Sequence, residues 1–245
     1  MAGGKPAPLS HPVGTVALMD LWTAVLHWLL PDRCPGCGVP CATALCPACT
    51  GRLIPAPAAA PPAHIDWWAS PFAYEGPLRE LVARLKYRNT RAGLGWLARA
   101  VAASVRAGAA SAGARLDAVT WPPTTVARAR QRGFDQAEHL ARAVARDLGL
   151  PARSLLRRQP GAAQTGRSRA DRARGPVFVA RTSVPGQRLL VVDDVATTGA
   201  TLAAAALALR AAGASSVAAA TAGRTPRRGE GAEGGGVAHT HTPAG

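Results

Sequence analysis

The sequence predicts an α/β fold with an at least partly parallel sheet, a helical segment before it and a small cysteine module on the N-terminal side. Residues 188–194 (RLLVVDD) begin with an apolar run without polar alternation, which is typical of a strand buried on both faces. A helical stretch from about 198 to 212 and a second short strand at 216–222 follow. Strand, helix and strand in this order form a βαβ unit, so the two strands should run parallel.

Composition limits the class of protein. The chain has 245 residues, with 29 Lys and Arg against 14 Asp and Glu, and a formal net charge of +15. A hydrophobic fraction of 48% excludes wholesale disorder, and the length suits one or two domains. The charge predicts an anionic partner, either a nucleic acid or a small molecule with several phosphates. Composition does not separate these two partners.

The chain is expected to be cytoplasmic and to lack a membrane span. The best candidate window, residues 13–30, contains Asp20 and His27 and is too polar for a span of about 20 apolar residues. Asp20 would also interrupt the apolar region of a signal peptide. In a reducing compartment, five cysteines point to metal binding or catalysis rather than to disulfides.

Breaks in the pattern divide the chain into six segments. The clearest boundary is a Pro/Ala-rich stretch (IPAPAAAPP), which predicts an extended and fairly stiff linker. Upstream of it a helix should end at Pro31, because proline stops helices. The predicted segments are a disordered tail (1–12), the N-terminal helix and cysteine module (13–54), the linker (55–63), a helical hood (64–111), the main α/β domain (112–224) and a disordered tail (225–245).

The hood segment carries two helical patterns. Apolar residues at helical spacing predict helices around 78–85 and 94–105. Aromatic residues between positions 67 and 74 are interpreted as packing residues of the hood rather than as a base-stacking platform.

The main domain begins with a short strand and a capped helix. Residues 116–121 (LDAVTW) predict the strand. Asp135 and Glu138 have the spacing of a capping pair, which predicts a helix starting there and ending at Gly149.

Two CxxC pairs predict a structural zinc site. Cys34 and Cys37 form the first pair, and Cys46 and Cys49 form the second. Four thiolates suit a tetrahedral zinc ion, and a closed four-cysteine site leaves no open position for catalysis. Unrelated buried thiols and a redox CxxC are the weaker alternatives. Cys41 has no CxxC partner and is expected to be a spare thiol, with replacement of one ligand as the alternative.

The stretch from Leu189 to Thr201 carries the main functional prediction. Asp193 and Asp194 stand at the carboxyl end of the predicted strand, where α/β proteins bind ligands. The turn after them leads into a helix N-terminus, whose backbone N–H groups bind anions. The expected phosphate-binding residues are Ala196, Thr197, Thr198, Gly199, Ala200 and Thr201.

The two acids predict what the rest of the ligand is. Their carboxylates would repel a phosphate, so they must face another part of the ligand, such as sugar hydroxyls or a Mg²⁺-bound sugar. A phosphate at one end and an acid-held ribose at the other describe a 5-phosphoribosyl group. Helix capping by the acids is the weaker alternative. A Walker-type nucleotide site is excluded, because its glycine-rich loop with a lysine is missing.

Residues 191–201 (VVDDVATTGAT) resemble the ribose-phosphate-binding segment of type I phosphoribosyltransferases. Together with the cysteine pairs, they are similar to the ComF (ComFC) family in particular. Three further segments agree with that family and occur in its order: LKYR at 85–88, RQRGFDQA at 130–137 and the stretch from Gln164 to Arg172. Asp135 and Arg167 depart from the family pattern, in which Asn and Leu are usual.

The resemblance implies a type I phosphoribosyltransferase-like core that binds 5-phosphoribosyl diphosphate or a 5′-phosphoribosyl nucleotide with Mg²⁺. It further implies transfer of the phosphoribosyl group to a base, with Lys86, Arg130, Arg132 and Arg172 as cations for the pyrophosphate or its loop. From this resemblance the chain is expected to be an enzyme, a phosphoribosyltransferase. The sequence identifies no residue that must be the general base, so it does not by itself establish catalysis. For an arginine taken alone, a solvated surface position is an equal alternative.

The same resemblance implies a second class of function, a non-catalytic competence factor for DNA uptake. Such a factor would sense a ligand in the pocket and contact a helicase-like competence protein or single-stranded DNA. The arginines would then bind backbone phosphates. Aromatic residues that stack on single strands are sparse near them, with only Phe134 close by.

Overall fold

The computed structural model describes residues 33–87, 91–125, 127, 130, 133–159 and 175–226. The helix predicted for 13–30, the predicted tail at 1–12 and most of the tail at 225–245 lie outside these residues. Within the described ranges, no helix is long and apolar enough to cross a membrane.

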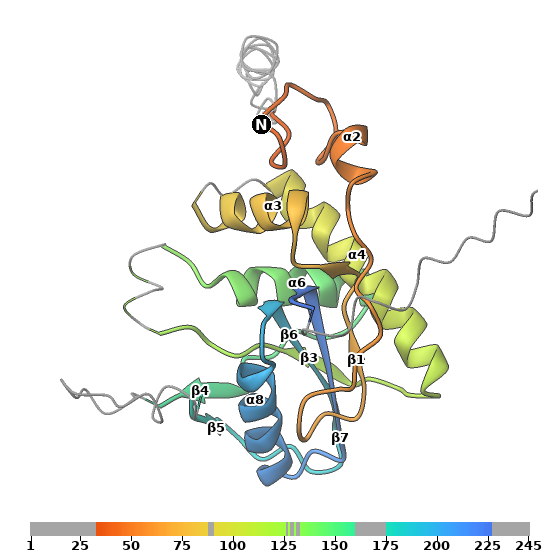
Figure 1. Ribbon diagram of the computed structural model, residues 1–245. Helices are drawn as coiled ribbons and strands as arrows, with labels where there is room; N and C mark the ends of the chain where they lie inside the picture. Colours follow the sequence, from red (N-terminus) through yellow and green to blue (C-terminus); the bar gives the residue numbers. More distant parts are fainter. Residues whose placement is uncertain are drawn as a thin grey trace, which may run out of the picture.

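A five-stranded parallel sheet forms the centre of the fold (Figure 1). Its order is β1-β7-β6-β3, and β2 pairs with β7 as well. This arrangement confirms the predicted α/β class with a parallel sheet. The strands are β1 (Trp68–Ala69), β2 (Phe72–Ala73), β3 (Ala118–Thr120), β6 (Arg188–Ala196) and β7 (Ser216–Arg224).

Helices cover both faces of this sheet. Two of them, α4 and α6, pack on one face with α3 beside α4, whereas α8 packs on the other (Figure 1). The helices are α3 (Gly76–Tyr87), α4 (Arg91–Ser111), α6 (Gln136–Leu148) and α8 (Ala200–Ala211). The two predicted hood helices are therefore α3 and α4, and the predicted helix of the βαβ unit is α8.

β6 is buried on both faces, as its apolar run predicts. Leu190 and Val192 belong to the core under α4 and α6, whereas Leu189 and Val191 belong to the core under α8. All four side chains are fully buried. Each face of the sheet therefore receives apolar side chains from the same strand, and β6 holds the two helical layers together.

α6 begins and ends where its sequence predicts. The Asp135 carboxylate accepts the Ala137 N–H at 3.1 Å, which caps the first turn. Glu138 forms an ion pair with Arg142 at 2.8 Å, one turn further along the helix. Gly149 ends the helix in the left-handed conformation with φ 69°, which glycine adopts without steric strain.

Four short strands have no clear signal in the sequence. β1 and β2 extend the sheet from within the hood segment, where the Phe72 ring stacks on Trp96 with centroids 5.7 Å apart. This contact supports a packing role for the aromatic residues of the hood. β4 (Leu156–Arg158) and β5 (Phe178–Ala180) form a separate antiparallel pair that contacts α8 (Figure 1).

Candidate functional site

The carboxyl ends of the parallel strands place the predicted ligand residues at one edge of the sheet. β6 ends at Ala196, and a three-residue turn leads from it to α8. β7 ends beside it, and the Thr225 N–H donates to the Ala196 carbonyl at 2.9 Å. Ligands of α/β proteins bind at this edge, so the position agrees with the expectation from the sequence.

The two acids lie partly exposed near the end of β6. The Asp193 carboxylate accepts the Asp194 N–H at 2.8 Å, and the Asp194 carboxylate accepts the Val195 N–H at 2.7 Å. Desolvation raises the pKa of the Asp193 carboxyl well above its usual value, and the negative charge of Asp194 raises it further. A cation or a set of hydroxyl donors at this point would relieve the repulsion between the two carboxylates.

Asp135 is a third acid near this edge, and sequence reasoning assigned it only a capping role. Its carboxylate accepts the Thr124 N–H at 2.8 Å and so ties the start of α6 to the loop after β3. Its charge also contributes to the raised pKa of Asp193. The sequence contains a signal for this additional charge. Asp135 is acidic at a position where the ComF family, which the sequence resembles, usually has a neutral Asn.

The turn between β6 and α8 has the geometry of an anion site. Gly199 precedes α8 with φ 77° and gives it no side-chain cap. The Thr198 hydroxyl accepts the Ala200 N–H at 3.3 Å, and both Thr197 and Thr198 are exposed. Because the first N–H groups of a helix lack partners within the helix, the start of α8 presents donors to an anion.

Gly199 has a neighbour that the sequence did not reveal. A side chain on Gly199 would place its Cβ 2.6 Å from the Cγ of Pro62 and 3.1 Å from its Cβ. The sequence predicts Gly199 as one of the phosphate-binding residues. In the structure, the contact with Pro62 and the positive φ each require glycine here.

The predicted cations are only partly within the described residues. Arg130 is exposed. Lys86 belongs to α3, but its side chain is not among the parts of the chain that the structure describes. Arg132, Arg172 and the stretch from Gln164 to Arg172 also lie outside it. The role of these four residues in binding pyrophosphate stays a prediction.

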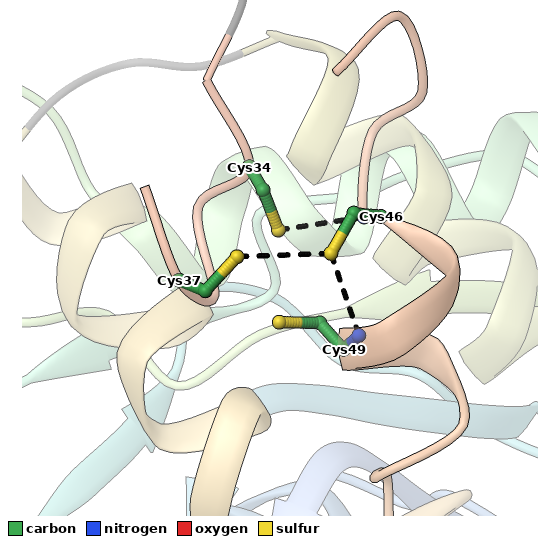
Figure 2. Close-up of side chains that lie close together, drawn as sticks. All are labelled: Cys34, Cys37, Cys46 and Cys49. Atoms are coloured by element: carbon green, nitrogen blue, oxygen red, sulfur yellow. Dashed lines mark hydrogen bonds between the residues drawn. The ribbon is translucent and has the colours of Figure 1, made fainter. Parts of the chain in front are cut away.

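The four CxxC cysteines converge, and their sulfur atoms all lie within 4.8 Å of one another (Figure 2). The Sγ atoms of Cys37 and Cys46 are 3.7 Å apart. Zinc–sulfur bonds of about 2.3 Å in a tetrahedron place sulfurs about 3.8 Å apart. Cys41 stays outside this cluster, and its thiol donates to the Thr43 carbonyl at 3.1 Å.

Local structure orients the sulfurs. The N–H of Cys46 donates to the Cys34 sulfur, and the N–H of Cys49, in the short helix α2 (Pro47–Thr50), donates to the Cys46 sulfur, each at 3.4 Å. A Cβ on Gly36 would lie 2.8 Å from the Cys49 sulfur, so only glycine leaves room for that thiol.

The buried thiols of the cluster have opposite pKa shifts. Burial raises the pKa of Cys34, but hydrogen bonds from backbone amides outweigh it and bring the pKa to about 6. Burial and the neighbouring cysteines raise the pKa of Cys49 to about 12. Closely spaced thiolates repel one another, so a positive ion would stabilise them, and the set of four cysteines fits Zn²⁺.

The cysteine cluster is joined to the hood helices by a hydrogen bond and by apolar packing. The Arg84 guanidinium of α3 donates to the Cys34 carbonyl at 3.4 Å. Leu53 and Trp96 pack against both the cysteine cluster and the core under α4 and α6. The cluster therefore sits as a small unit on the ends of the hood helices.

One comparison with known proteins identifies the family of this α/β domain. Residues 109–233, slightly more than half of the chain, match the model of the phosphoribosyl transferase domain. The chain therefore belongs to the phosphoribosyl transferase domain family. No curated protein matches the chain.

Several solved structures are similar to part of the chain. A Bacillus subtilis glutamine phosphoribosylpyrophosphate amidotransferase, complexed with ADP and GMP, is 21% identical with a TM-score of 0.38, over 58% of this chain and 30% of that one. An allosteric regulatory enzyme of purine biosynthesis is 23% identical with a TM-score of 0.34, over 58% and 26%. A Trypanosoma cruzi hypoxanthine phosphoribosyl transferase is 16% identical with a TM-score of 0.35, over 55% and 68%. The family assignment rests on the family model and not on these scores.

Proposed function

We propose that the chain binds 5-phosphoribosyl diphosphate or a 5′-phosphoribosyl nucleotide at the carboxyl edge of β6. The observation that carries the proposal is the order of groups from the end of β6 into α8. Asp193 and Asp194 lie near the end of β6, and the three-residue turn after the strand leads to the donor-rich start of α8. The carboxylates would accept hydrogen bonds from the ribose hydroxyls, and the amides of residues 198–201 would hold the 5′-phosphate.

Mg²⁺ fits this site because the crowded carboxylates require a positive partner. When bound, it would offset the charge of the pyrophosphate and so assist its departure. The chain's own contribution is to hold the ribose and phosphate in place while the bond between the ribose and pyrophosphate breaks. Lys86, Arg130, Arg132 and Arg172 are proposed to supply further positive charge to the leaving group.

The transfer step would make the chain a ComF-like phosphoribosyltransferase with a base as acceptor. Its test is the release of pyrophosphate from 5-phosphoribosyl diphosphate in the presence of a panel of purine and pyrimidine bases. Release that depends on one base and on Mg²⁺ supports the transferase. If the chain binds 5-phosphoribosyl diphosphate but releases no pyrophosphate with any base, it is a binding protein and not a transferase.

The net charge of +15 favours a second candidate, a cytoplasmic competence factor that binds single-stranded DNA or a helicase-like partner. DNA affinity that rests on arginines should fall with salt, with a slope of about −0.7 per phosphate contact on single strands. A phosphoribosyl site should depend on Mg²⁺ and on Asp194 instead. Titration of both ligands at two salt concentrations separates the two functions.

The cysteine cluster is proposed to bind one structural Zn²⁺ through Cys34, Cys37, Cys46 and Cys49. The convergence of four sulfurs supports this proposal. A filled tetrahedron leaves no position for substrate, so the ion would stabilise the module and take no part in the transfer reaction.

A further inference from the structure

Residues 54–62 connect the cysteine module to the turn between β6 and α8, and we call them the strap. The strap starts directly after Leu53, which packs against the cysteine cluster. It ends at Pro62, whose ring lies against Gly199. One short segment therefore links the two candidate sites of the molecule.

Hydrogen bonds fix the first half of the strap to the sheet. The Ala73 N–H donates to the Ile54 carbonyl at 2.8 Å, and the Ala56 N–H donates to the Pro71 carbonyl at 3.1 Å. The Pro57 carbonyl accepts a hydrogen bond from the guanidinium of Arg224. These contacts hold the strap beside β2 and the end of β7.

Arg224 links this part of the strap to the end of β6. It is 3% exposed, and its guanidinium lies over the Trp68 ring at 5.7 Å. Its backbone stands in register with Ala196, the last residue of β6. The strap is therefore anchored next to the strand from which the phosphate-binding turn emerges.

The residues after the strap are fixed to α8 itself. Ile65 is buried in the same core cluster as Leu202 of α8. Asp66 forms an ion pair with Arg210 of α8 and accepts hydrogen bonds from Ser216 and Val217 at the start of β7. Because it is anchored on both sides, Pro62 can hold its position against Gly199.

We infer that Pro62 is a positioning residue for the phosphate-binding turn. Gly199 has a φ of 77°, and because glycine has no side chain, only its surroundings can hold it in that conformation. The Pro62 ring lies against Gly199 and would oppose its rearrangement. The turn is thereby preorganised before an anion arrives, which lowers the ordering cost of binding. The consequence for phosphate affinity rests on the proposed function.

The first test uses hydrogen exchange and needs no ligand. Pro62→Ala should raise the exchange rate of the Ala203 amide, which donates to the Gly199 carbonyl at 2.9 Å, by about tenfold, equivalent to about 1.4 kcal/mol of lost protection. Pro61→Ala is the matched control, because Pro61 is exposed and its replacement has the same effect on the unfolded chain. Equal exchange at the Ala203 amide in the two variants would overturn the inference.

A second substitution guards against general unfolding. Gly199→Ala would place a Cβ against Pro62, so its effect should be smaller in a Pro62→Ala background than in the wild-type chain. This difference, measured as the exchange rate of the amide of Ala203 in α8, isolates the contact between the two residues. Additive effects of the two substitutions would contradict a direct contact.

The ligand measurement separates the two proposals. Ribose 5-phosphate should bind Pro62→Ala about five- to tenfold more weakly than Pro61→Ala, a ratio worth about 1 to 1.4 kcal/mol. If the wild-type chain binds no ribose 5-phosphate but the exchange result holds, the proposed function fails and the positioning role stands. If ribose 5-phosphate binds all three proteins equally, Pro62 does not position the turn and the proposed function survives.

Discussion

Thr198 has a hydroxyl that contributes to the fold and is free in its geometry to donate to the proposed ligand as well. In the structure this exposed side chain accepts the Ala200 N–H at 3.3 Å. A hydroxyl can at the same time donate its own hydrogen to a phosphate oxygen. The Thr-Thr-Gly order in the sequence was enough to predict this residue as a phosphate ligand. Pro62, by contrast, has no recognisable sequence signal, because its role comes from a contact with Gly199 across a long sequence separation.

Thr198→Ala should weaken ribose 5-phosphate binding by roughly ten- to a hundredfold. A hydrogen bond to a charged group contributes about 1.5–3 kcal/mol, and about 1.4 kcal/mol corresponds to tenfold. Thr198→Ser keeps the hydroxyl and should bind nearly as well as the wild-type chain. Calorimetric titration measures both affinities, and circular dichroism should be the same for both variants. Equal affinities of the alanine and serine variants would remove the hydroxyl from the site.

At the scale of elements, strands differ in how far the sequence reveals them. β6 and β7 could be predicted because nine-residue strands carry a long apolar run, and β6 has two acids near its end. β1 and β2 have two residues each, and β4 and β5 have three, too few to show a period. Their strand character comes from partners distant in the sequence, so only the structure shows them. The position of β6 depends at its start on Asp117, whose carboxylate accepts the Arg188 N–H at 2.8 Å.

The Asp117–Arg188 pair predicts a pH dependence of stability. Hydrogen bonds from the side chain and backbone of Arg188 lower the pKa of Asp117 from 3.8 to about 2. A lowered pKa in the folded state stabilises the fold above the unfolded value, and this contribution is lost as the pH falls from about 4 to about 2. Asp117→Asn should therefore lower the denaturant midpoint at neutral pH but change it little near pH 2.

The size of this effect should be modest. Both side chains are about a third exposed, so solvent screens the pair. Glu80→Gln, an exposed acid on α3, serves as the control for loss of one negative charge. A difference between wild type and Asp117→Asn that grows on acidification would contradict the assigned direction.

At the scale of the whole molecule, the sequence predicted both candidate sites but not their connection. The CxxC spacing predicted the four cysteines that converge in the structure. The acid pair and the turn after it predicted the ligand-binding edge of the sheet. The stretch predicted as a linker lies hydrogen-bonded to the sheet, and Pro62 lies against the phosphate-binding turn. A proline-rich composition indicates an extended chain but says nothing about what that chain packs against.

The cysteine module should depend on its metal for folding. Structural zinc contributes on the order of 10–16 kcal/mol to small zinc-binding peptides, and the buried cluster of this module consists of three of the predicted zinc ligands and Leu45. Elemental analysis should find about one zinc per chain in the wild type and in Cys41→Ser, and little in Cys46→Ser. Metal-free wild-type protein with the same protection of residues 34–49 from exchange would contradict a structural role for zinc.

The measurement closest to the central claim is the affinity for 5-phosphoribosyl diphosphate with Mg²⁺, compared between wild type, Asp194→Asn and Glu80→Gln. Both variants remove one negative charge, but only Asp194 lies at the carboxyl edge of β6. We predict that wild type and Glu80→Gln bind equally and that Asp194→Asn binds at least about tenfold more weakly, a loss of about 1.4 kcal/mol. Equal binding by all three proteins, or none by the wild type, would contradict a phosphoribosyl site at this edge.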